Sequence, residues 1–261
     1  LLALTQMGMP MAWGQITSVP ASPTPASPPA PADASERMSV SHGTGFSIGN
    51  GYILTAQHVV RGATRVMVGQ GQGVWALSEV VKTDAVLDLA LIKTPLNLPA
   101  LRISRSASVP VGVEVFVIGY PQPSIQGLTP KITQGLVNGL SRSQQADSDK
   151  GYFQISAEVS RGNSGGPLLG PDGSVIGMVQ RKLDSQRVLE RTQEWTVNVS
   201  YALRSSHLAG FLEGTPVNLP MDNMDLASVL RPHQIYAQTQ AGVVPIVAST
   251  RIPATTSKPG P

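Results

Sequence analysis

The sequence predicts an all-β protein. Between Ser39 and Val199, short apolar runs alternate with turn signals, and hardly any helical periodicity is present. The segments GTGFSI and YILTA flank Gly-Asn-Gly, which is a strong hairpin signal. Together these observations indicate about eleven or twelve strands, a number expected of barrels or sandwiches.

Further strands are expected, in order, at TRVMVG, WALSEVVK, DLALIK, VEVFVIGY, KITQGLVNGL, YFQISAEV, PLLG, SVIGMVQ and EWTVNV. One closing helix is expected in SYALRSSHLAGFLE. Its apolar residues Tyr201, Leu208, Phe211 and Leu212 have helix-compatible spacings, and Ser200 is a candidate N-cap. These elements predict one folded domain over residues 35–213.

The two ends of the chain differ in composition from this domain. Residues 1–14 are largely apolar and carry no charge, so we expect the end of a secretory signal peptide. A remnant of a membrane anchor is the alternative. The apolar stretch is short and interrupted, which argues against a membrane span. Residues 15–34 are rich in Pro, Ala and Ser, and we expect an extended linker. Residues 214–261 are too short for a second full domain, and we expect a tail that is mostly disordered or loosely packed.

The composition argues against several kinds of function. Charged residues make up 13% of the chain, the net charge is +3, and no dense basic run occurs, so no nucleic-acid partner is expected. The chain has no cysteine, which excludes a thiol nucleophile and a cysteine zinc site. Its four histidines have no metal-ligand spacing. We therefore expect no metal or other cofactor. Because the apolar stretch in residues 1–14 is short and interrupted, we also expect no association with a membrane.

Ser164 is a candidate nucleophile because of its surroundings in RGNSGGPLLG. The nearby glycines permit the tight backbone that an exposed reactive hydroxyl needs. The N–H groups of Gly162 and Ser164 could then form an oxyanion hole. For this stretch alone, an ordinary turn between two strands is the alternative.

A serine nucleophile also needs a base that is oriented by an acid. His58 follows the apolar strand YILTA, and histidine suits the role of base because the ordinary pKa of this residue type lies near neutrality; a half-buried structural histidine is the alternative. Asp88 lies in the apolar run VLDLALIK, where a carboxylate is costly unless it is paired. His58 is the obvious partner, whereas Asp84 fits an ordinary turn role. The order His, Asp, Ser is that of chymotrypsin-type triads.

These motifs resemble those of trypsin-like serine proteases, specifically the bacterial HtrA/Deg family. GTGFSIGNGYILTAQHVV is similar to the histidine motif, TDAVLDLALIK to the aspartate motif and RGNSGGPLLGPDGSVIGMV to the serine motif. The resemblance implies two six-stranded β-barrels of the chymotrypsin type, with the triad between them and a C-terminal helix. It also implies a homo-oligomer, since related enzymes often form trimers. The segment after Glu213 is too short for the PDZ domain that many members carry.

The resemblance implies an exported serine endopeptidase, periplasmic or secreted, that cleaves unfolded or exposed polypeptides through an acyl-enzyme. His58 would be the general base and acid, Asp88 would orient its ring, and Ser164 would attack the peptide carbonyl. A binding module or chaperone that has lost catalysis is the alternative from another class, and an esterase is a third.

The same resemblance assigns the substrate contacts. Glu158 maps to the base of the S1 pocket, and Gln180, Arg181 and Lys182 map to the strand that lines the substrate. A buried carboxylate would favour basic P1 residues, but related bacterial enzymes usually have a small apolar pocket. Arg161 and Arg181 could also neutralise Glu158, so the P1 preference stays open.

Overall fold

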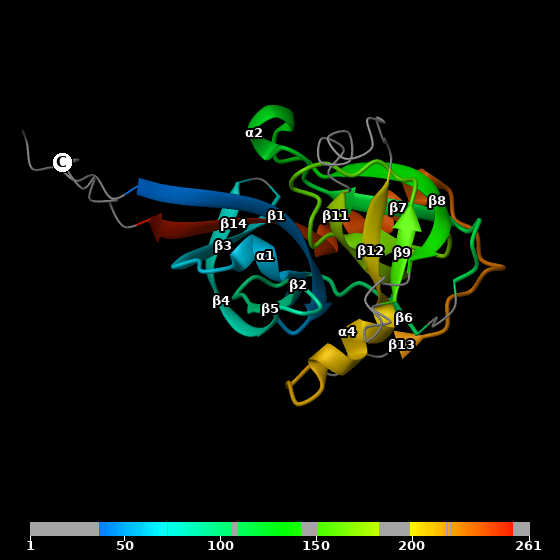
Figure 1. The fold of residues 1–261 in the computed structure, drawn as a ribbon, viewed down its shortest axis with the longest axis horizontal. Helices are drawn as coiled ribbons and strands as arrows, with labels where there is room; N and C mark the ends of the chain where they lie inside the picture. The colour runs from blue at the N-terminus through cyan, green and yellow to red at the C-terminus, as the bar shows by residue number, and fades with distance from the viewer. Residues whose placement is uncertain are drawn as a thin grey trace, which may run out of the picture. The chain divides into compact units, whose positions relative to one another are not determined.

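The computed structural model describes residues 37–71, 73–105, 109–141, 151–182, 199–217, 219 and 221–252. Within this part of the chain the strands form two adjacent β-barrels (Figure 1). The expected signal remnant (1–14) and linker (15–34) lie outside the described residues. Among the helices that the structure describes, none combines the length and apolar character that a membrane span requires.

The first barrel is closed by six antiparallel strands in the order β1-β14-β3-β4-β5-β2. They are β1 (Arg37–Gly49), β2 (Tyr52–Ala56), β3 (Arg65–Gln70), β4 (Val74–Asp84), β5 (Leu89–Lys93) and β14 (Val243–Ile252). Successive side chains of a strand face opposite sides, and in β2 and β5 the residues of both faces are mostly buried. Phe46, Ile53, Leu91 and Ile246 are among the buried ones.

The connection between β1 and β2 is the hairpin that the Asn-Gly signal predicts. Asn50 and Gly51 have φ values of 52° and 72°, and a positive φ at both central residues is what a two-residue turn of type I′ needs. Gly49 pairs with Tyr52 across the turn. This prediction is confirmed.

The second barrel also contains six strands and is closed by the pairing of β10 with β11. They are β7 (Glu114–Gly119), β8 (Lys131–Ser141), β9 (Tyr152–Ile155), β10 (Pro167–Leu169), β11 (Val175–Lys182) and β12 (Ser200–Arg204). Two short parallel strands, β6 (Ile103–Ser104) and β13 (Met221–Asp222), extend the sheet beyond β11. The predicted all-β class with two six-stranded barrels is therefore confirmed.

Short helices connect or cover the barrels. They are α1 (Gln57–Val60), α2 (Pro123–Gln126), α4 (Ser205–Leu212) and α5 (Pro232–Thr239), with a 3₁₀ turn η1 (Gln240–Gly242). The expected closing helix is α4, which buries Leu208, Phe211 and Leu212. It begins at Ser205, so the prediction that Ser200 caps it is wrong. Ser200 starts β12 instead, because this stretch pairs with both β9 and β11.

The C-terminal segment differs from the loosely packed tail expected after residue 213. β14 lies between β1 and β3 and completes the first barrel, with Ile246 opposite Gly43 and Ala248 opposite Val66. Both Ile246 and Ala248 are buried. The folded domain therefore continues to β14, and residues 253–261 of the expected tail lie outside the described part. The apolar run of β14 is visible in the sequence, but only the gap between β1 and β3 explains where it packs.

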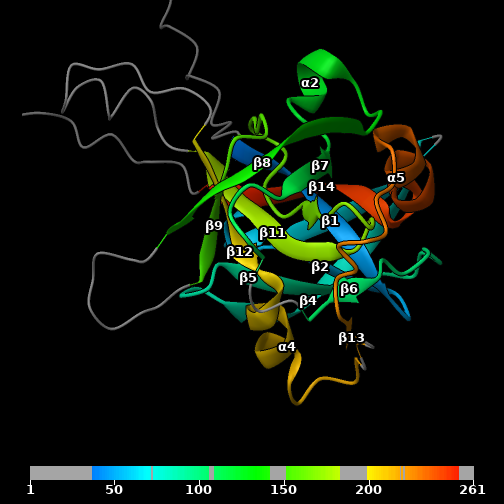
Figure 2. The same ribbon diagram turned by 90° about the vertical axis from the view of Figure 1, so that its right-hand side faces the viewer.

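The segment between α4 and β14 passes along the second barrel before it reaches the first (Figure 2). The Tyr236 hydroxyl of α5 donates to the Pro130 carbonyl at 3.1 Å, and the Tyr120 hydroxyl, next to β7, donates to the Val243 carbonyl at 3.1 Å. Burial, with Tyr236 nearby, raises the pKa of Tyr120 to about 12. Tyr120 therefore keeps its proton, and this link between the barrels, at neutral pH.

A buried carboxylate anchors the start of this segment. Asp172 accepts hydrogen bonds from the hydroxyl and N–H of Ser174 at 2.6 and 3.0 Å and from the Asp225 N–H at 3.1 Å. It also lies 2.8 Å from the guanidinium of Arg102. Burial opposes ionisation, but the hydrogen bonds and the Arg102 charge outweigh it and hold the pKa of Asp172 below its ordinary value of 3.8.

Replacing Asp172 with asparagine is expected to lower the free energy of unfolding by about 2–3 kcal/mol at neutral pH, because buried donors lose a charged acceptor. Since the folded-state pKa is lowered, this contribution is present above the unfolded-state pKa and is lost as the pH falls through the folded-state pKa. Urea denaturation of both proteins across this range should therefore show a difference that shrinks toward acid. The exposed Asp222 provides the control Asp222→Asn, and a pH-independent effect of Asp172→Asn would contradict the assignment.

Candidate active site

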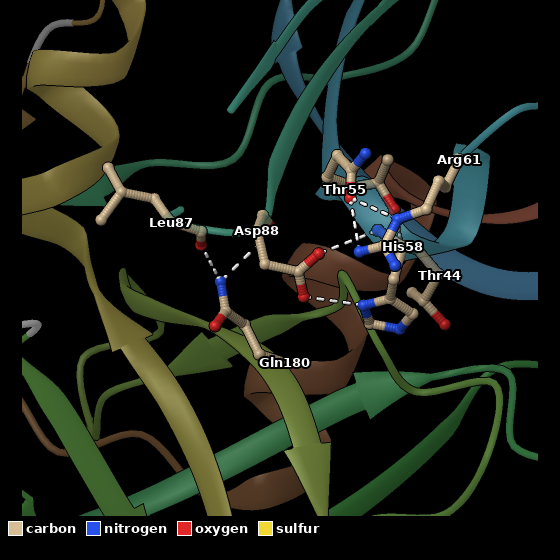
Figure 3. Close-up of polar contacts among 8 residues, drawn as sticks. Thr44, Thr55, His58, Arg61, Leu87, Asp88 and Gln180 are labelled. Carbon is tan, nitrogen blue, oxygen red and sulfur yellow. Dashed lines mark hydrogen bonds and ion pairs between the residues drawn. The ribbon is translucent and has the colours of Figure 1, made fainter. Parts of the chain in front are cut away.

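The turn before β5 and the helix α1 bring Asp88 and His58 together (Figure 3). β2 and β5 pair so that Ala56 lies opposite Leu89, which places the residues after Ala56 beside those before Leu89. Asp88 Oδ1 accepts from the His58 backbone N–H at 2.8 Å, and Oδ2 lies 2.7 Å from His58 Nδ1. An ionised carboxylate can only accept, so the proton of this contact lies on Nδ1. Nε2 is then the ring nitrogen that can accept a proton.

Asp88 precedes β5 in a turn, whereas the sequence suggested a place within the strand. Its φ of 54° lies in the left-handed region, which Asp tolerates better than most residues. From the second barrel, the side-chain amide of Gln180 donates to the Leu87 carbonyl and, at 3.3 Å, to the Asp88 carbonyl (Figure 3). Gln180 is 3% exposed, so its side chain supports the Asp88 turn. The predicted substrate contact of this residue would therefore be made by its backbone.

The turn that carries Ser164, here called the serine turn (residues 160–166), has its peptide planes fixed through their carbonyls. The acceptor–donor pairs are Arg161 O with Gln122 N (2.7 Å), Gly162 O with Thr44 Oγ1 (2.6 Å), Asn163 O with Gly166 N (2.9 Å) and Ser164 O with Thr44 N (2.9 Å). Because a peptide is planar and trans, fixing a carbonyl fixes the direction of the next N–H. In the described part of the chain, the N–H groups of Gly162 and Ser164 donate to no protein acceptor. Both N–H groups therefore remain candidates for the oxyanion hole that the sequence predicts.

The glycines of the serine turn are required by close contacts. A Cβ at Gly162 would lie 2.3 Å from the Tyr120 carbonyl oxygen, and a Cβ at Gly165 would lie 2.3 Å from the Thr44 carbonyl oxygen. The φ values of Gly162 and Gly165 are 101° and 84°, a region that side chains disfavour. The glycine excess around Ser164 is thus explained by the fit of this turn against the first barrel.

Ser164 lies beside the residues that lead into α1. The Cβ position of Gly165 would be 2.7 Å from the Ala56 nitrogen, so the serine turn packs against the end of β2, just before His58. Ser164 itself is half-buried. Among the described residues, no hydrogen bond joins its hydroxyl to His58; such bonds are often long before substrate binds.

The expected substrate-binding residues of the second barrel lie in different settings. Glu158 is exposed, whereas Ala157 and Val159 on either side are buried. In this extended segment, alternate side chains face opposite sides, so Glu158 points outward and is not the buried carboxylate that a preference for basic P1 residues would require. Arg181 and Lys182 continue β11 and pair with β12; their side chains lie outside the described part.

Sequence reasoning missed two residues of this site, Thr44 and Thr55. Both are fully buried, and both hydroxyls donate to backbone carbonyls, Thr55 to that of Thr44 at 2.7 Å. The available signal was a polar residue inside an apolar strand, in TGF and in LTA. Since buried polar groups require partners, such residues mark contacts that the sequence alone does not identify.

Comparison with known proteins agrees with this fold. Residues 43–178 match the trypsin-like peptidase domain. The chain is 32% identical over 203 residues to a probable periplasmic serine endoprotease, DegP-like, of Halomonas elongata, covering 77% of this chain and 38% of the relative. The serine endoprotease of Yersinia pestis matches with a TM-score of 0.53 and 25% identity, covering 66% of this chain and 56% of that one. The HtrA-type protease AlgW, solved with a decapeptide, matches with a TM-score of 0.53 and 27% identity, covering 64% and 49%.

The chain therefore belongs to the trypsin-like peptidase family. Within that family its relatives include HtrA and DegP proteins, so the resemblance to the HtrA/Deg type and the chymotrypsin type of the barrels are confirmed. The chain spans less than two thirds of these relatives, 38% of the Halomonas protein and 56% of the Yersinia structure.

Proposed function

We propose that this chain is a serine endopeptidase in which His58, Asp88 and Ser164 form the catalytic triad. The observation that carries the proposal is the pair of contacts from Asp88 to the backbone and ring of His58, at 2.8 and 2.7 Å. Family membership and relatives named serine endoproteases support it. The proposed substrates are unfolded or exposed polypeptides, and the proposed reaction uses no cofactor.

In this mechanism His58 Nε2 removes the proton of the Ser164 hydroxyl while Oγ attacks the carbonyl carbon of the scissile peptide. The carbonyl π-electron pair moves to its oxygen, and the N–H groups of Gly162 and Ser164 donate to that oxyanion. His58 then gives its proton to the leaving amine, and the carbon–nitrogen bond breaks to leave an acyl-enzyme. Water activated by His58 hydrolyses the ester and restores the Ser164 hydroxyl. Asp88 stays ionised and keeps the His58 ring oriented throughout.

We further propose that the protein acts after export, in the periplasm or outside the cell. The Halomonas relative is named as periplasmic, and the uncharged residues 1–14 resemble the end of a signal peptide. The HtrA resemblance also favours a homo-oligomer, which light scattering after size-exclusion chromatography would measure.

Glu158 is not expected to select a basic P1 residue. Its carboxylate is exposed, and an exposed charge attracts an opposite one only weakly. Glu158→Gln should therefore change the ratio of kcat/KM values for Arg and Val at P1 by less than about threefold. Peptide-library profiling of wild type should show cleavage after small aliphatic residues. A strong preference for Lys or Arg that Glu158→Gln abolishes would contradict this expectation.

Labelling by a fluorophosphonate probe, combined with cleavage of unfolded casein, tests the proposed function. Wild type should react with the probe and cleave casein, and natively folded Ser164→Ala should do neither. A folded wild type that binds casein but does not react with the probe would be a binding module instead. A wild type that reacts and hydrolyses small esters but leaves casein intact would be an esterase.

A further inference from the structure

We propose that Thr44, a residue of β1, is a positioning residue that holds the serine turn in the geometry that binds the oxyanion. This inference rests on the proposed function, since it assigns a role relative to the Gly162 and Ser164 N–H groups. Thr44 is 0% exposed and comes from the first barrel. It therefore acts through the serine turn rather than on substrate.

Thr44 makes four hydrogen bonds that surround the serine turn. Its hydroxyl donates to the Gly162 carbonyl at 2.6 Å and accepts from the Tyr120 N–H at 3.0 Å. Its backbone N–H donates to the Ser164 carbonyl at 2.9 Å. Its own carbonyl accepts from the Thr55 hydroxyl at 2.7 Å. One residue thus bonds to carbonyls on both sides of Asn163.

These bonds determine the orientation of the peptide that carries the Ser164 N–H. That peptide joins Asn163 to Ser164, and Thr44 holds the peptides on either side of it, through Gly162 O and Ser164 O. Because each peptide unit is rigid and planar, fixing both neighbours leaves little freedom for the one between them. The carbonyl of that peptide, Asn163 O, accepts from the Gly166 N–H within the turn at 2.9 Å. Thr44 therefore fixes the serine turn as a unit against the first barrel, and with it the direction of the Ser164 N–H.

The hydroxyl of Thr44 has its own direction fixed. Because the Tyr120 N–H points at Oγ1, the proton of that oxygen is left to donate to Gly162 O. The space around it is also closed: a Cβ at Gly119 would lie 2.9 Å from Oγ1, and a Cβ at Gly166 would lie 3.2 Å from the Thr44 methyl carbon. Pairing of β1 with β14, where Thr44 lies opposite Pro245, and the Thr55 hydroxyl fix the backbone of Thr44.

Removing this hydroxyl is expected to weaken transition-state binding more than substrate binding. Valine has nearly the shape of threonine but leaves Gly162 O without its donor, so the peptide between Gly162 and Asn163 keeps only the bond from the Asn163 N–H to Ser160 O at 3.0 Å. The serine turn can then shift relative to the first barrel, which moves the neighbouring peptides that carry the Gly162 and Ser164 N–H groups. A preorganised donor matters most when charge develops on the carbonyl oxygen. The expected result is a lower kcat with KM nearly unchanged, as for loss of an interaction made only in the transition state.

The test compares wild type, Thr44→Val and Thr44→Ser, with Thr239→Val as a matched control. The Thr239 hydroxyl is also buried and donates to a backbone carbonyl, that of Ile235 at 2.7 Å, but within α5. Measured quantities are the second-order rate constant for fluorophosphonate labelling, kcat and KM on casein-derived peptides, their pH profiles, and the folded fraction by circular dichroism. Thr55→Val, which frees only the Thr44 carbonyl, is the second variant should Thr44→Val not fold.

Thr44→Val is expected to label and turn over about 30- to 300-fold more slowly per folded molecule. This is less than the roughly 10²- to 10³-fold found for losing one oxyanion donor, because the donors are misaligned and not removed. Its pH profile should keep its shape, because the His58–Asp88 contact is unchanged. Thr44→Ser should recover to within about fivefold, Thr239→Val should match wild type, and Thr55→Val should label severalfold more slowly. Wild-type rates in the folded Thr44 or Thr55 valine variants, or no recovery in Thr44→Ser, would overturn the inference. A wild type that does not label would instead defeat the proposed function.

Discussion

Alanine at His58 is expected to lower kcat about 10⁴- to 10⁶-fold while the protein stays folded, as is found when the base of a serine protease triad is removed. The His58 side chain is 38% exposed and contacts the Asp88 carboxylate. Its replacement by alanine therefore removes few packing contacts from the hydrophobic core. In the proposed mechanism the His58 imidazole accepts the Ser164 proton, so this substitution removes the base. Steady-state cleavage of casein-derived peptides, with circular dichroism as the folding check, measures the effect.

Three further variants test the same assignment. Asp88→Asn should lower kcat about 10⁴-fold, because an amide that donates to His58 leaves the ring in the wrong tautomer. Asp84→Asn is the matched control in the same loop: Asp84 Oδ1 accepts from the Val86 and Leu87 N–H groups at 2.8 and 2.9 Å, which an amide oxygen can also do. Equal activities of Asp88→Asn and Asp84→Asn would contradict the assignment. Adding Ser164→Ala to His58→Ala should cost little more, since triad residues act as a unit.

Removal of residues 232–261 is expected to unfold the first barrel and abolish activity. β14 pairs with β1 from Arg37 opposite Ile252 to Phe46 opposite Val243, and on its other edge it pairs with β3. Its loss would expose the barrel core and leave two unpaired strand edges, which favours aggregation. Thermal unfolding should then lose its cooperative transition, whereas a native-like transition in the truncated chain would contradict the role of β14.

Point variants test the same strand without changing chain length. Ile246→Ala should lower the free energy of unfolding by about 2–5 kcal/mol, as for other buried Ile residues. Val247→Ala, on the other face of β14 and only half-buried, should cost about 1 kcal/mol or less. Urea unfolding measures both. If neither substitution mattered, β14 would not belong to the barrel core in solution.

Local chemistry explains why so much of the fold was predictable. Asn50 and Gly51 specify a turn through their own φ preferences, and short apolar segments flank them on both sides. Each candidate triad residue stands out from its immediate neighbours. His58 is a base after an apolar strand, Asp88 is a carboxylate in an apolar run, and Ser164 is a hydroxyl among glycines. Such features depend on a few adjacent residues, so they can be recognised without a partner.

Other features depend on partners that are distant in the sequence. Ser200 had a good local pattern for a helix cap, yet it belongs to β12 because it pairs with both β9 and β11. Gln180 was expected near substrate, but the carbonyls of Leu87 and Asp88 provide acceptors for its buried amide. In each case tertiary contacts outweighed a local preference, because a buried backbone or amide group must be hydrogen-bonded.

By itself, the sequence determined the all-β class, the first hairpin and the residues available for serine chemistry. Only the tertiary structure decided that β14 closes the first barrel, that Glu158 points outward, and that Thr44 bonds to Gly162 across 118 positions of the chain. The physical reason is the same for all three. Residue type and spacing set what a segment can do, whereas burial and hydrogen-bond partners from distant strands set which of these possibilities is stable.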